Sequence, residues 1–247
     1  MAQYEDNLAR QGGVTGSAAA VDEGLRSYML GVYNYMAMGV ALTGVMAYAV
    51  SSMAVQDGQL TQLGQLLYTS PLKWVLMLAP LAFVLIISFG INKLSPAATQ
   101  GVFWAFAAVM GVSISSVFLV FTSSSIAQIF FVTAAAFAGL SAWGYVTKKD
   151  LSGWGSFLIM GVIGLIVASI VNIFLGSSAL QWAISVITLL VFAGLTAYDN
   201  QRLKDEYLMI RNDAAAVAKS SIMGALSLYI NFINMFMAAL QLFGDRE

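Results

Sequence analysis

Apolar residues occur along the chain in long stretches that are separated by short polar breaks. Each stretch has roughly 17 to 25 residues, enough for a helix rising 1.5 Å per residue to cross about 30 Å of hydrocarbon. The pattern predicts seven transmembrane helices, at 29–53, 74–91, 98–121, 126–146, 157–175, 181–198 and 220–243. We therefore expect an all-α integral membrane protein whose principal partner is the lipid bilayer.

The composition agrees with a membrane protein and excludes nucleic-acid binding. Of the 247 residues, 60% are hydrophobic and 9% are charged, whereas about a quarter of the residues in a soluble domain are charged. The net charge of −1 offers no basic surface for nucleic acid. Residues 1–28 mix charged residues with Gly, Ser and Ala, and we expect a flexible cytoplasmic tail there, followed by one seven-helix domain at 29–247.

Basic residues orient the predicted bundle, because Lys and Arg near short loops stay in the cytoplasm. All but two of the 11 lysines and arginines fall on the N-terminal side of the predicted membrane. Lys73 and Arg246 fall on the other side. The pattern predicts a cytoplasmic N-terminus and a C-terminus on the opposite face.

The chain contains neither cysteine nor histidine, so zinc–thiolate, zinc–histidine and serine–histidine catalysis are excluded. An intramembrane aspartyl protease would need two acids, and the last span contains none. We expect no enzyme, no catalytic residue and no cofactor. Any chemistry must use Asp, Glu, amides and hydroxyls.

Polar and small residues form one stripe along the last predicted span. The residues of the stripe are spaced by three or four positions, which places them on one helical face. They are Ser220, Gly224, Ser227, Asn231, Asn234, Ala238 and Gln241. Amides facing lipid would lack hydrogen-bond partners, so this helix should be central, with the stripe facing the bundle or a wet cavity. Helix packing through small residues and amide hydrogen bonds explains the same pattern.

Asp199 is the acid that lies deepest in the predicted membrane, at the cytoplasmic end of the sixth span. A charged residue inside a membrane span is costly, and at the centre of the helix the cost is about 2.5 to 3.5 kcal/mol. Asp199 is either a buried functional carboxylate or an exposed residue that starts the charged connection 200–219, which has the alternating charges of a solvated or interfacial helix.

Four segments together resemble the bacterial branch of the Bax-inhibitor-motif family of membrane proteins. They are GYVTKKDLS at 144–152, GSFL at 155–158, TAYDNQ at 196–201 and ALSLYINFIN at 225–234. The resemblance covers nearly all of the chain after the predicted tail. It implies a multi-pass protein of the bacterial inner membrane with a periplasmic C-terminus, in which six helices surround the last, and a pH-sensitive calcium leak.

In studied members of this family, two aspartates hold the pore closed and respond to protonation. Asp199 matches the first, and Asn231 stands where the second would be. Without a second carboxylate, the mutual repulsion that couples two acids is lost, and we expect a weaker response near neutral pH. The gate and ion pathway would comprise Asp199, Asn231 and Asn234, with Asp199 as a weak, transient calcium ligand.

Two further expectations come from the resemblance. The closed state of the family uses a basic residue near the end of the second helix, for which Lys93 is the nearest candidate, although Lys93 is equally suited to be an interfacial anchor. Some bacterial relatives modulate a membrane-anchored ATP-dependent protease as a slowly degraded competitor. The alternative function is therefore protease modulation through the predicted tail.

Overall fold

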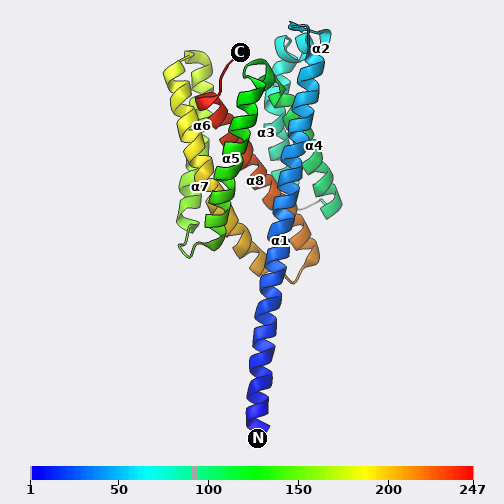
Figure 1. Cartoon of the computed structure of the whole chain (residues 1–247), viewed down its shortest axis with the longest axis vertical. Coiled ribbons are helices and arrows are strands. Elements are labelled where there is room, and N and C mark those ends of the chain that lie inside the picture. The colour runs from blue at the N-terminus through cyan, green and yellow to red at the C-terminus, as the bar shows by residue number, and fades with distance from the viewer. Residues whose placement is uncertain (1, 91–93, 247) are drawn as a thin grey trace.

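The computed structural model describes residues 2–90 and 94–246, which form a helical bundle (Figure 1). A two-residue hairpin, β1 (Val55–Gln56) and β2 (Gln59–Leu60), follows the first helix. A π-helix, η1 (Gln65–Thr69), precedes α3, and a 3₁₀-helix, η3 (Ser115–Leu119), continues α4. The α-helices are α1 (Ala2–Ala54), α2 (Gln62–Gly64), α3 (Leu72–Gly90), α4 (Pro96–Ile114), α5 (Ser123–Val146), α6 (Ser152–Leu175), α7 (Ser178–Ile210) and α8 (Ala214–Phe243).

The described residues contain six straight candidate membrane spans and a seventh that is broken. The six comprise α1 from Val21 onward, α4 with η3, and α5 to α8. The seventh combines the helical segments Gln62–Thr69 and Leu72–Val84, which meet at 64°. This arrangement confirms the predicted all-α class, with seven spans when the bent pair is counted as one. The bent pair starts earlier than the apolar pattern indicated for the second span.

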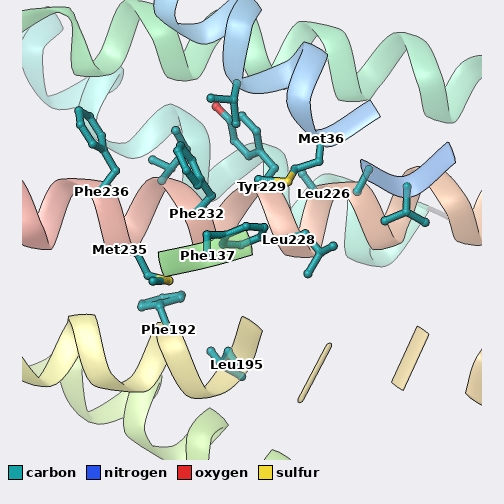
Figure 2. Packing of buried hydrophobic residues seen from close by; sticks show 14 of the residues in the cluster. Met36, Phe137, Phe192, Leu195, Leu226, Leu228, Tyr229, Phe232, Met235 and Phe236 are labelled. Atoms are coloured by element: carbon teal, nitrogen blue, oxygen red, sulfur yellow. The ribbon is translucent and has the colours of Figure 1, made fainter. Parts of the chain in front are cut away.

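The last helix, α8, is the centre of the bundle. It packs against α1, α4, α5 and α7, and 72% of its most apolar window is buried, against 17 to 33% for the other straight spans. Figure 2 shows Tyr229, Phe232 and Phe236 projecting from α8 among side chains of the surrounding helices. The predicted central position is confirmed.

Side-chain caps explain where several helices begin. The hydroxyls of Ser95, Thr122 and Ser177 accept hydrogen bonds from backbone N–H groups in the first turns of α4, α5 and α7. Asp213 Oδ1 accepts from the N–H groups of Ala215 and Ala216 and so starts α8. These bonds satisfy donors that a helix leaves unpaired at its N-terminus.

Two helices are longer than the apolar pattern predicts. The helix α1 runs from Ala2, and its first part projects from the bundle (Figure 1). Leu25 and Tyr28 are already buried in the bundle, and the Tyr28 hydroxyl pairs with Ser220 Oγ of α8 at 2.7 Å. The helix α7 continues beyond the predicted end at 198 to Ile210.

Close backbone approach joins α5 to α7. A Cβ atom added at Gly144 would overlap the Ala197 carbonyl oxygen and would lie 2.8 Å from the Ala197 Cα. Small residues permit such contacts between membrane helices. At Gly139 of the same helix, an added Cβ would meet no atom within 4 Å.

We expect Gly144→Ala to destabilise the protein by about 1–3 kcal/mol, because the methyl group must force α5 away from α7. Gly139→Ala is the matched control, which should be neutral or stabilising by up to about 1 kcal/mol through helix propensity. Thermal unfolding in detergent measures both. Equal unfolding midpoints for the two variants would show that the α5–α7 contact does not depend on this glycine.

Candidate functional site

Asp199 lies inside α7 and is buried, with 7% of its surface exposed. The helix continues for a further 11 residues, to Ile210, because the charged segment after Asn200 contains good helix formers and neither Gly nor Pro. The carboxylate is therefore part of a regular helix that faces the bundle, and does not begin an exposed loop.

One oxygen of the Asp199 carboxylate is in an ion pair, and the other accepts a hydrogen bond. Arg202 Nη2 lies 3.0 Å from Oδ1, and Asn231 Nδ2 donates to Oδ2 at 2.8 Å. One donor is one turn away on α7 and the other is on α8. A buried carboxylate needs such partners to remain charged. The bond to Asn231 also joins α7 to α8, the two helices that form the most extensive contact in the bundle.

Arg202 belongs to the candidate site, whereas the sequence pattern placed it only in a charged connection. Its side chain is 44% exposed, so its guanidinium group extends from the aqueous edge toward the buried acid. Its Nη2 also donates to Ser227 Oγ of α8 at 3.3 Å. The spacing of three residues between Asp199 and Arg202 is a usual helical ion-pair spacing, and it was the signal available in the sequence.

The polar stripe of α8 faces α7 along most of its length. Ser220 Oγ donates to Glu206 Oε1 at 2.6 Å near one end, and Gln241 Oε1 accepts from Ser185 Oγ at 2.9 Å near the other. Between these ends lie the Arg202–Ser227 and Asn231–Asp199 bonds. The stripe therefore looks into the bundle, as its period predicts.

Of the four residues predicted to form the gate, the structure joins Asp199 and Asn231. The Asn234 amide donates to the Ile230 carbonyl of its own helix at 2.8 Å, so among the described residues its hydrogen bond does not reach the acid. Lys93 lies outside the described residues.

The segment TAYDNQ at 196–201 connects Asp199 to the rest of the bundle. Asn200 is fully buried, donates to the Thr196 carbonyl at 2.7 Å and accepts from the Tyr33 hydroxyl of α1. Gln201 Nε2 donates to the Lys149 carbonyl, and its Oε1 accepts from the Leu151 N–H, both at 2.8 Å. Segments 144–152, 196–201 and 225–234 thus meet at one place.

The chemistry of this site is that of a single carboxylate among amides. Within residues 2–90 and 94–246, no group of three or more His, Cys, Asp or Glu side chains converges on a point. A hard divalent cation is held tightly by six to eight oxygen ligands. The arrangement therefore suits brief contact with a cation, or a change of protonation.

The protein is therefore a polytopic membrane protein with a polar site inside its bundle. This site is a buried carboxylate between α7 and the central last helix, α8. Residues 25–247 match the family described as Inhibitor of apoptosis-promoting Bax1, or Bax1-I. The chain belongs to this family, and the resemblance that the motifs indicate is confirmed.

Relatives with substantial identity come from several bacteria. A protein of Caulobacter vibrioides is 51% identical over 230 residues, which cover 92% of each chain. Inner membrane protein YbhL of Escherichia coli (strain K12) is 44% identical over 227 residues, or 91% of this chain and 94% of YbhL. Protein RP147 of Rickettsia prowazekii is 41% identical over 226 residues, or 92% of each chain. The chain is thus a multi-pass membrane protein of a bacterial type.

Removal of the Asn231 amide should be more costly than removal of the Asn234 amide. Asn231→Ala leaves one buried oxygen of Asp199 without a donor, and we expect a loss of about 1–3 kcal/mol. Asn234→Ala removes only a bond to the backbone of the same helix, so its loss should be smaller. Chemical or thermal unfolding in detergent compares the pair, and a greater loss for Asn234→Ala would contradict the assigned site.

Proposed function

We propose that this protein is a passive leak for cations, chiefly calcium, across the bacterial inner membrane, with its N-terminus cytoplasmic and its C-terminus periplasmic. Protonation at the contact between α7 and α8 regulates the leak. The observation that supports this proposal is the buried Asp199 carboxylate, which bonds to Arg202 and to Asn231 across the two helices. Ionisable residues inside membrane spans are costly and typically mark ion or proton pathways.

Charge on Asp199 holds the contact closed. The deprotonated acid pairs with Arg202 and accepts from Asn231, and a proton removes the negative charge that attracts the guanidinium group. The link from α7 to α8 then weakens, so the leak increases as the pH falls. Glu206, which accepts a hydrogen bond from Ser220, is a second acid at the α7–α8 contact.

A leak needs only weak ligation. An ion must leave as readily as it enters, so a transient site conducts better than a tight one. One carboxylate, with amide and backbone oxygens near it, provides such a site. Because Asn231 replaces a second acid, no pair of carboxylates titrates in coupled steps, and the pH response should be shallow.

Calcium entry into vesicles tests the proposal. Purified protein in calcium-free liposomes should admit calcium faster than empty vesicles, with a shallow increase toward acid pH. Asn231→Asp should steepen the pH dependence, because two carboxylates about 4 Å apart repel by about 4 kcal/mol at an effective dielectric constant near 20. Asp199→Ala should abolish the pH dependence.

Asn234→Asp is the matched control, since it adds the same charge one helical turn away from the Asp199 contact. Its profile should differ from that of Asn231→Asp. The proposal fails if wild-type vesicles show no calcium entry at any pH from about 5 to 8. Identical profiles for wild type and Asn231→Asp would remove Asn231 from the gate.

A second candidate function is modulation of a membrane-anchored ATP-dependent protease. The observation that favours it is the projection of the first part of α1 beyond the bundle, where a protease could engage this segment (Figure 1). On this interpretation the protein acts as a slowly degraded competitor of other substrates.

Deletion of residues 2–20 separates the two functions. The truncated protein should lose any effect on degradation of a second substrate by the protease, because the accessible end is gone, while its calcium flux in liposomes stays unchanged. Substrate degradation in proteoliposomes that contain both proteins measures the first, and the flux assay measures the second. A parallel loss of flux would show that the two activities share the same segment.

A further inference from the structure

A groove of about 460 Å³ opens between α1 and α5. Both helices pack against α7 and α8, and the space between them is lined by apolar side chains, including Met29, Met36 and Phe137. No water is available in the hydrocarbon core, so lipid must fill a groove that opens to the membrane there.

The length of the groove corresponds to one leaflet. Its lining on α1 extends from Arg26 to Ala37, which is about 16 Å at 1.5 Å per residue. Half of a hydrocarbon core of about 30 Å is about 15 Å. A single acyl chain would therefore extend from the bilayer surface to the midplane.

One end of the groove carries a guanidinium group. Arg26 lines it from α1 and Tyr145 lines it from α5, and Lys204 Nζ lies 3.2 Å from the Tyr145 carbonyl oxygen. Among the described residues, the ion pair of this protein joins Arg202 to Asp199, so Arg26 is left to attract another anion. Basic residues near a membrane surface attract anionic lipid.

The Ser141 hydroxyl supplies a separate indication of a ligand. Ser141 lines the groove one helical turn from Tyr145 and is 5% exposed, yet its Oγ has no hydrogen-bond partner within the described part of the chain. A buried hydroxyl without a partner is costly. The ester carbonyls of a phospholipid lie just below its phosphate, at about this depth.

We propose that the groove between α1 and α5 binds one anionic phospholipid of the surrounding bilayer. Its phosphate lies at Arg26, one acyl chain follows the apolar lining toward Ala37, and an ester carbonyl accepts from the Ser141 hydroxyl. The site does not depend on the proposed leak, and lipid binding can be measured without any flux assay.

Native mass spectrometry of the purified full-length protein tests this site. The protein is incubated in detergent with equal amounts of phosphatidylglycerol and phosphatidylcholine that carry the same acyl chains. Wild type should retain one phosphatidylglycerol in about fivefold preference, the factor that corresponds to roughly 1 kcal/mol per basic residue near a membrane surface. Arg26→Gln should abolish the preference, and Lys219→Gln, which removes the same charge outside the lining, should keep it.

Filling the groove should exclude both lipids. Ala138 and Ala37 line it from opposite walls, so Ala138→Phe and, as an independent variant, Ala37→Phe should each lose the bound lipid. Ala136→Phe is the control, since Ala136 is exposed on α5 and lies outside the lining. Thermal unfolding identifies a variant that fails to fold. In that case, lipid retention by the other variant tests whether the groove is the binding site.

Three results would overturn the proposal. Equal retention of the two lipids by wild type would remove the role of Arg26, and unchanged retention by a folded Ala138→Phe or Ala37→Phe variant would place the lipid elsewhere. Displacement of phosphatidylglycerol by glycerol phosphate, which has no acyl chains, would show a site for free phosphate esters instead of a lipid.

Discussion

The absence of water in the hydrocarbon core determines how this bundle is assembled. Every amide, hydroxyl and carboxylate in a membrane span must find its partner within the protein. The helix α8 carries a row of such groups, and most of them bond to α7, with the Asn231–Asp199 bond near the middle. The central position of α8 follows, because a helix with this row cannot lie at the lipid boundary.

The same constraint explains why much of the site could be predicted. A polar residue in an apolar span is costly wherever it faces lipid, so the spacing of Ser220, Asn231 and Gln241 already indicates an inward face. Asp199 is prominent for the same reason, as the deepest acid. These inferences need only the helical period and the cost of burial, and both are properties of the local sequence.

Other features depend on tertiary contacts that the apolar pattern does not contain. Arg202 follows the hydrophobic stretch and is partly exposed, so composition assigns it to the aqueous region, whereas the continuation of α7 to Ile210 places it beside Asp199. The broken second span, which combines Gln62–Thr69 and Leu72–Val84, begins in a polar segment that hydropathy alone assigns to a loop. The second partner of the carboxylate and the extent of the second span therefore required the structure.

The groove between α1 and α5 and the acid site share one wall. Tyr33 lines the groove between α1 and α5, and its hydroxyl donates to Asn200, the residue next to Asp199 on α7. Asn200 is fully buried and also bonds to Thr196 of α7, so it has little freedom to compensate for a shift of Tyr33. A lipid that moves the Tyr33 ring and a proton that neutralises Asp199 would act on the same turn of α7. On the two proposals, bilayer composition and pH would therefore act on the gate through the same part of α7.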